Sequence, residues 1–278
     1  MVQAARGWRY VTMDPRLRGY ADIRRHVERT PGRPTVVTDS SRLLAHLVVV
    51  DSDPLEARVL TRTAALEVVT DVAYLRWAIA TGTADDLAIF HERTTHGAGV
   101  VLEADRVVAL LEYDGGIAGL PGRDRTLVGA IRRWVDRHLE AAARYDPEGP
   151  TIEAVADALD EHLGGAVRTA VLDAVAAGWR ARLDGAGPPA LEVVLLAAAH
   201  HDRLLRDVGD WAVAVGLTSR GEVSRAKDRL VDAGLVETTA VVDGEGRPPL
   251  RLHLDAPALR RSPPEAYGRV AAAILDEG

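Results

Sequence analysis

The chain has 278 residues, a length that favours more than one domain, and 47% of them are hydrophobic, which is enough for buried cores. It contains no cysteine, which excludes disulfides, cysteine-ligated zinc and thiol catalysis. The 41 acidic residues outnumber the 34 basic ones and give a formal net charge of −7, and Lys227 is the only lysine.

This charge pattern favours a protein adapted to a molar-salt cytoplasm, because carboxylates hold water and cations there, where other surfaces salt out. The alternative is a GC-rich genome, which encodes arginine in place of lysine. The longest apolar runs, Leu43–Val50 and Leu191–Ala199, are shorter than the roughly 18 residues that a membrane-spanning helix needs. No apolar core follows the N-terminal arginines, so no secretory signal is expected and the predicted location is cytoplasmic.

Residues 1–30 are interpreted as a basic, poorly patterned leader, and residues 31–147 as an α/β domain that senses an effector. The segment "PTVVTDSSRLLAHLV" predicts a strand followed by a helix, with Asp39, Ser40 or Ser41 as the helix cap. Alternating or periodic apolar residues predict the remaining elements of this domain. They are strands at 57–63 and 87–92, helices at 71–80 and 125–145, and a hairpin over 99–113 that turns at Ala104–Asp105.

Proline and glycine mark two boundaries, at 146–150 and 184–189, which enclose an alanine-rich segment at 151–183. Apolar residues with a 3.6-residue period predict two helices there, separated by Gly164–Gly165. The pair is interpreted as a helical connector between the end domains. A helical hairpin that pairs two chains is the alternative.

Residues 190–256 have the pattern of a winged helix-turn-helix, and residues 257–278 predict a C-terminal helix. A serine before the third helix can cap it, and glycines after the second and third helices can end them. The predicted parts are helices at 191–208 and 210–215, Gly216, a third helix from the cap Ser219 to Ala233, Gly234, strands at 235–242 and 250–254, and a wing at 243–249.

The third helix carries residues that could read DNA on the side opposite its apolar positions Val223, Ala226 and Leu230. Arginine can donate two hydrogen bonds to guanine, and serine can bond a base edge or a phosphate. The segment 216–254 has six cations and six acids, so it is neutral rather than basic. The predicted DNA-binding residues are Ser219, Arg220, Ser224, Arg225, Lys227 and, on the wing, Arg247. Arg225 is predicted to read bases, but a rotated helix would place Arg220 or Lys227 there instead.

This C-terminal region resembles the winged helix of the haloarchaeal TbsP-type transcriptional regulators and, more loosely, archaeal and MarR/TrmB-like regulators. The residues that carry the resemblance are Trp211, Gly216, "VSR" at 223–225, "GLV" at 234–236 and "GRPPLRLHL" at 246–254. The resemblance implies a sensor domain N-terminal to the DNA reader. It also implies control of central sugar metabolism.

Thr61, Arg62 and His91 stand near predicted strand ends, where α/β domains often open a pocket, so they are candidates for binding a small anionic metabolite such as a sugar phosphate. The alternative for Arg62 is a surface or salt-bridge arginine. The histidines of "HERTTHG" and His200–His201 lack the convergence that a metal site requires. No phosphate-binding loop, nucleophile elbow or paired acid motif is present, so neither a cofactor nor catalysis is predicted.

Together these patterns predict a sequence-specific DNA-binding transcriptional regulator that responds to a metabolite. A homodimer on double-stranded DNA is expected, because one winged helix reads too few base pairs for useful selectivity. The alternative is a protein-interaction scaffold whose winged helix binds a protein partner.

Overall fold

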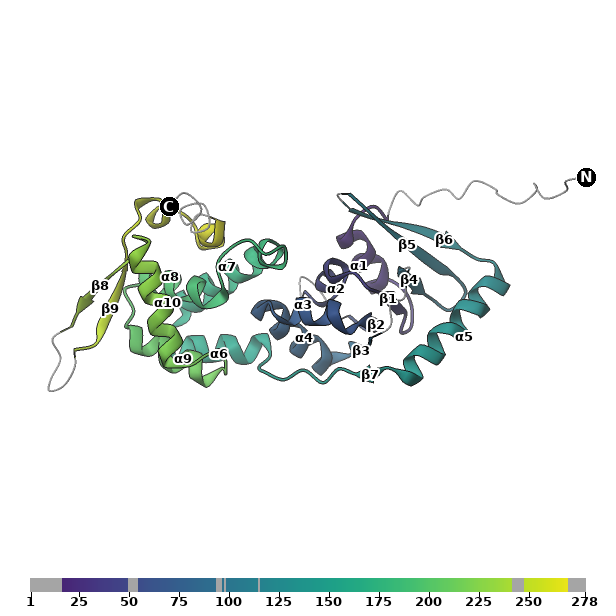
Figure 1. Cartoon of the computed structure of the whole chain (residues 1–278), viewed down its shortest axis with the longest axis horizontal. Helices are drawn as coiled ribbons and strands as arrows, with labels where there is room; N and C mark the ends of the chain where they lie inside the picture. The colour runs from purple at the N-terminus through teal and green to yellow at the C-terminus, as the bar shows by residue number, and fades with distance from the viewer. Residues whose placement is uncertain are drawn as a thin grey trace, which may run out of the picture. The chain divides into compact units, whose positions relative to one another are not determined.

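The computed structural model describes residues 17–49, 55–93, 97, 99–114, 116–241 and 248–269. These residues form two compact units (Figure 1). Unit 1 holds the described residues up to Val69 and Gly82–Pro147, and unit 2 holds Thr70–Thr81 and those from Glu148 onward. Helix α4 (Ala73–Asp85) therefore starts in unit 2 and ends in unit 1. None of the described helices is long and apolar enough to span a membrane.

Unit 1 is built on a mixed sheet, which confirms the predicted α/β fold of the N-terminal region. Within the described residues the sheet has seven strands, in the order β6-β5-β4-β1-β2-β3-β7. The three strands β1, β2 and β3 are parallel, and the others join them antiparallel. The strands are β1 (Thr35–Thr38), β2 (Arg58–Arg62), β3 (Ala88–Glu92), β4 (Gly99–Leu102), β5 (Val107–Tyr113), β6 (Gly116–Gly122) and β7 (Ala143–Arg144).

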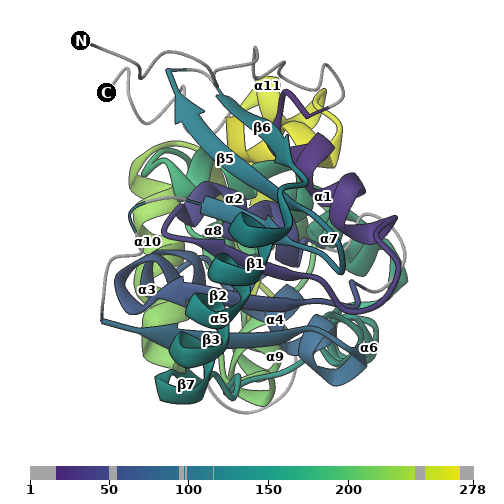
Figure 2. The same ribbon diagram turned by 90° about the vertical axis from the view of Figure 1, so that its right-hand side faces the viewer.

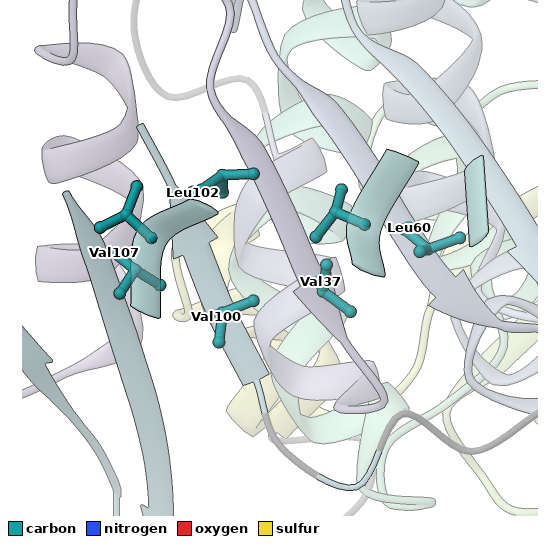
Figure 3. Close-up of a cluster of buried hydrophobic side chains, with 7 residues drawn as sticks. Val37, Leu60, Val100, Leu102 and Val107 are labelled. Carbon is teal, nitrogen blue, oxygen red and sulfur yellow. The ribbon is translucent and has the colours of Figure 1, made fainter. Parts of the chain in front are cut away.

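Both faces of the central strands are buried, because helices cover each of them. Helix α5 (Arg125–Ala141) crosses one face (Figure 2), where its Val128 and Val135 join a cluster with side chains of β1, β2, β4 and β5. Figure 3 draws this cluster and labels the five side chains that the strands contribute, from Val107 to Leu60. Helices α1 (Tyr20–Glu28), α2 (Ser41–Val48) and α3 (Thr63–Thr70) lie on the other face (Figure 1).

Three features of unit 1 were not predicted from the sequence. Helix α1 lies inside the predicted leader, where its Ile23 and Val27 are fully buried and the helix packs against α2. The glycine-rich segment Gly116–Gly122 is strand β6, paired along its whole length with β5. Thr63 begins α3 instead of ending a strand. The packing of α1 against α2 joins separate segments of the chain, which a local pattern does not show, whereas β6 pairs with the adjacent strand β5 despite its glycines.

Unit 2 is helical with a two-stranded sheet, which confirms the predicted helix-turn-helix. Helix α6 packs against α9, and α7 packs against α8 and the short helix η1. The segment 151–183 is therefore part of this unit's core and not only a connector. The elements are α6 (Ile152–Leu163), α7 (Gly165–Leu183), α8 (Ala190–His200), α9 (Leu205–Ala214), α10 (Arg220–Asp232), β8 (Val236–Ala240), β9 (Leu250–Leu254), α11 (Pro257–Arg260) and η1 (Pro264–Ala266).

The predicted helix over 191–208 is wrong, because two helices occupy this segment. Helix α8 ends at His200, and Asp202 adopts a left-handed conformation with φ of 52°. Aspartate tolerates this conformation better than most residues. The main chain of Arg203 and Leu204 then pairs with β9, where the Leu252 amide donates to the Arg203 carbonyl at 2.9 Å. The second helix consequently begins at Leu205 rather than at 210.

The predicted single helix over 257–278 is also wrong in its described part. Helix α11 ends at Arg260, and the separate 3-10 helix η1 follows it at Pro264–Ala266. Proline at 263 and 264 explains the break, since proline interrupts a helix interior. Residues 270–278 lie outside the described residues.

Candidate nucleic-acid interface

Helix α10 is held at both ends by the local signals that its sequence contains. The Ser219 side chain accepts a hydrogen bond from the Glu222 amide at 3.3 Å and so caps the first turn. Before it, Gly216 has φ of 64°, and the Leu217 amide donates to the Ala212 carbonyl at the end of α9. After it, Gly234 has φ of 66° and ends the helix. The turn and the third helix are therefore where the pattern predicted them.

The two sides of α10 differ as the helical period predicted. Val223, Ala226 and Leu230 are buried against α8, α9 and β8. The opposite side is exposed over the whole length of the helix. Its exposed residues are Gly221, Ser224, Arg225, Asp228 and Asp232. The buried positions fix the rotation of the helix, so this exposed side faces directly away from the core of the unit.

Ser224 and Arg225 stand at the centre of this exposed side. Arg225 is 67% exposed and forms an ion pair with Glu222, one helical turn before it. An exposed pair of this kind contributes about 0.3–0.5 kcal/mol. The guanidinium can therefore leave Glu222 for a base edge or a phosphate at little cost.

Arg220 and Lys227 are less available for reading bases. The Nε and Nη2 atoms of Arg220 donate to Oδ1 of Asp210 at 2.9 and 2.6 Å, which ties the start of α10 to α9. Lys227 is only 14% exposed and pairs with Asp228. Neither side chain occupies the centre of the exposed side, which leaves Arg225 as the candidate base-reading arginine.

Arg229 has a structural role that the sequence did not reveal. Its Nε and Nη2 atoms donate to Oε1 of Glu192 on α8 at 3.1 and 2.9 Å. The Glu192 side chain is only 8% exposed, so Arg229 is the partner of a buried carboxylate. The pair fixes α10 to α8, and a sequence has no local signal for a contact between residues 37 positions apart.

Strands β8 and β9 form the two sides of the wing. Thr239 Oγ1 and His253 Nε2 are 2.9 Å apart across the two strands, and His253 also pairs with Asp202. Arg251 donates from Nη1 to the Asp202 carbonyl at 2.8 Å. These contacts anchor the base of the wing to the end of α8. Arg247, the predicted wing contact, lies outside the described residues.

The three predicted effector residues occupy neighbouring strand ends in unit 1. Thr61 pairs in register with His91 across β2 and β3. Thr61 is fully buried, so a ligand in solution does not reach its side chain. Arg62 is half-buried, and its buried Nε has no hydrogen-bond partner within the described residues. The His91 ring nitrogen Nδ1 lies 3.1 Å from Thr63 Oγ1. Of the three predicted effector residues, Arg62 and His91 are thus the ones that a ligand could contact.

A polar pocket of about 470 Å³ lies at the same end of the strands as these three residues, and the sequence did not predict it. It is lined by Tyr20, Ser40 and Glu112, among others, at the carboxyl ends of β1 and β5. The Tyr20 hydroxyl donates to Glu112 Oε1 at 3.0 Å, and burial, followed by this bond and the Glu112 charge, raises the Tyr20 pKa. No local sequence signal joins these residues, because Tyr20 lies in the predicted leader and is 92 positions from Glu112.

Metal ligands do not gather in the part of the chain that the structure describes, where no group of three or more suitable side chains converges. His96, one of the histidines of "HERTTHG", lies outside the described residues.

Comparison with known families finds a match in the C-terminal region. Residues 151–272 match the model described as "Transcriptional regulator TbsP-like, C-terminal HTH domain". The match includes α6 and α7 as well as the helix-turn-helix and the wing, in agreement with their packing in unit 2. The N-terminal region lies outside it. No curated protein matches the chain.

Among solved structures, that of TrmBL2, an archaeal chromatin protein with a novel mode of DNA binding, is similar with a TM-score of 0.33 and 11% sequence identity. The similarity covers 46% of this chain and 52% of that chain, so this chain spans about half the length of that protein.

Proposed function

We propose that the protein is a sequence-specific DNA-binding transcriptional regulator that places α10 in the major groove. The observation that carries the proposal is the exposed side of α10, with Ser224 and Arg225 at its centre, in a domain that matches a regulator helix-turn-helix. Arginine in such a position can bond O6 and N7 of guanine, and serine can reach a base edge or a phosphate.

Gly221 supports a close approach to this side of α10. A side chain at this position would meet only Ser219 Oγ, at an ordinary contact distance of 3.7 Å, so packing within the chain does not require glycine. Glycine in a helix costs about 1 kcal/mol relative to alanine. A partner backbone that lies against the first turn explains why a small residue is useful there.

We infer that the protein acts as a homodimer. One helix-turn-helix reads a short half-site, and two related by a two-fold axis read a pair of half-sites with greater selectivity.

The neutral charge of the segment 216–254 supports DNA binding through short-range contacts. Such contacts suit a halophilic cytoplasm, where the Debye length falls to about 3 Å at 1 M salt.

Replacing Arg225 with alanine is expected to weaken binding to the preferred site by about 1–3 kcal/mol, or roughly 5- to 150-fold in Kd, and to relax the preference at one base position. The measurement is the Kd of the full chain for a duplex selected from random sequences and for a scrambled duplex, in KCl buffer. Arg137→Ala is the matched control, because Arg137 is an exposed arginine on α5 of unit 1.

Equal affinity of Arg225→Ala and the unaltered chain for both duplexes would contradict the proposed role of α10. Failure of the unaltered chain to bind any duplex would favour the alternative function, a scaffold that uses the exposed side of α10 to bind a protein partner.

We also propose that unit 1 binds a small anionic metabolite, such as a sugar phosphate, and that the protein regulates central sugar metabolism. The support is the position of Arg62 and His91 at the carboxyl ends of parallel strands, where open α/β sheets bind ligands. Arg62 is only half-buried, so part of its side chain remains open to an anion.

Fructose 1,6-bisphosphate and glucose 6-phosphate are expected to raise the melting temperature of the full chain, and glucose is not, since the charge is what Arg62 would recognise. Arg62→Gln is expected to remove this shift. Arg93→Gln is a control that makes the same charge change at an exposed residue just after β3. A shift that survives in Arg62→Gln, or no shift with any sugar phosphate, would overturn this proposal.

A further inference from the structure

Unit 2 contains a cavity of about 890 Å³ that the proposed function does not use. Its walls are the second half of α7, the linker from α7 to α8, the start of α8, the turn before α10, residues 71–74 and 76 around the start of α4, and Gly268 and Arg269. All of its lining residues belong to unit 2. Cavities of roughly 300–1,000 Å³ are the usual size of small-molecule sites.

The inner surface of this cavity is largely apolar. Val175 and Trp179 of α7 and Val193 of α8 line it, and all three are buried. Gly178 leaves part of the space empty, since a Cβ built on it meets no atom within 4 Å. An apolar space of this size next to water is unfavourable unless something apolar fills it.

The charged residues around the cavity are mainly basic. Arg180 lies over the Trp179 ring, with its Cζ 4.5 Å from the ring centroid. Arg182 and Arg269 form no ion pair within the described residues. In a chain with a net charge of −7, a group of arginines without acidic partners favours an anion. The charged lining residues are Arg76, Arg180, Arg182 and Arg269 against Asp71 and Glu222.

We propose that this cavity binds a small amphipathic anion, with its apolar body against Trp179 and Val193 and its acidic group at Arg182. The wall includes Leu217 and Thr218 of the turn before α10, and Glu222 in the first helical turn of α10. A bound ligand thus contacts the segment that positions the candidate reading helix. This regulatory consequence rests on the proposed DNA binding, whereas ligand binding itself does not.

The test is isothermal titration of the full chain with decanoate, an anion with an apolar body, and with decanol, which has the same body without the charge. One decanoate per chain is expected, with decanol bound more weakly. Gly178→Leu places a side chain in the apolar part of the cavity and is expected to weaken decanoate binding at least tenfold, whereas Gly178→Ala retains most of it. Arg182→Gln is expected to weaken decanoate at least threefold and to leave decanol unchanged.

Gly178→Leu should fold, because the added side chain meets open space and leucine is a better helix former than glycine. Gly129→Leu on α5 of unit 1 is the matched control and is expected to bind decanoate normally. Absent or non-saturable binding, or equal binding by Gly178→Leu, would overturn the proposal. The proposal would also be overturned if decanoate does not bind and Gly178→Leu is a monomer where the unaltered chain is a dimer. That result would show that a second copy of the chain covers the cavity. A chain that binds decanoate but no DNA would retain this proposal and refute the proposed function.

Discussion

Trp211→Ala is expected to lower the free energy of unfolding of unit 2 by about 3–5 kcal/mol, which is the usual cost of emptying a buried tryptophan site. Trp211 is 0% exposed and lies on α9, which packs against α6, α8, α10 and β9. Removing this side chain therefore weakens the packing of α9 against all four of these elements. The measurement is hydrogen exchange of peptides from α8 to α10 in increasing urea, which reports this unit separately from unit 1.

Two variants of α9 control for this result. Val213→Ala changes a residue that is 48% exposed on the same helix, and we expect a change of about 0.5 kcal/mol or less. Trp211→Phe keeps most of the apolar volume, and the indole Nε1 has no hydrogen-bond partner among the described residues, so its loss leaves no acceptor unpaired. A cost for Trp211→Ala as small as that of Val213→Ala would show that Trp211 is not at the centre of this core.

Arg229→Ala is expected to lower the same free energy of unfolding by about 2–3 kcal/mol, because it leaves the carboxylate of Glu192 buried without its partner. The effect should be asymmetric. Arg229 is 55% exposed and can turn to water when Glu192 is replaced, whereas Glu192 is 8% exposed and cannot. Glu192→Gln is therefore expected to cost less than Arg229→Ala.

A double-mutant cycle measures this asymmetry. The variant that carries both Arg229→Ala and Glu192→Gln is expected to be more stable than Arg229→Ala alone, since no unpaired charge remains buried. Arg225→Ala on the same helix is the control for charge removal at an exposed pair, with an expected change in stability of at most about 0.5 kcal/mol. Equal costs for Arg229→Ala and Arg225→Ala would contradict the structural role of Arg229.

Several parts of the fold and of the candidate interface were predictable because their signals lie within a few residues of each other. The spacing of Val223, Ala226 and Leu230 determined which side of α10 is buried, and thereby which side is exposed. Ser219 and Gly216 specified the start of α10 and the turn before it, because an N-cap hydrogen bond and a positive φ are properties of one residue and its close neighbours.

The tertiary structure alone decided which polar side chains of α10 are available to contact a partner. Arg220 and Arg229 resemble Arg225 in the sequence, but Asp210 and Glu192 from other helices engage them. It also decided where α8 ends, since β9 supplies the partner for the main chain at Arg203, and it placed α1 against α2 rather than in a leader. The physical reason is the same in each case: the free energy of these arrangements comes from burial and pairing between segments distant in the chain, which local conformational preference does not contain.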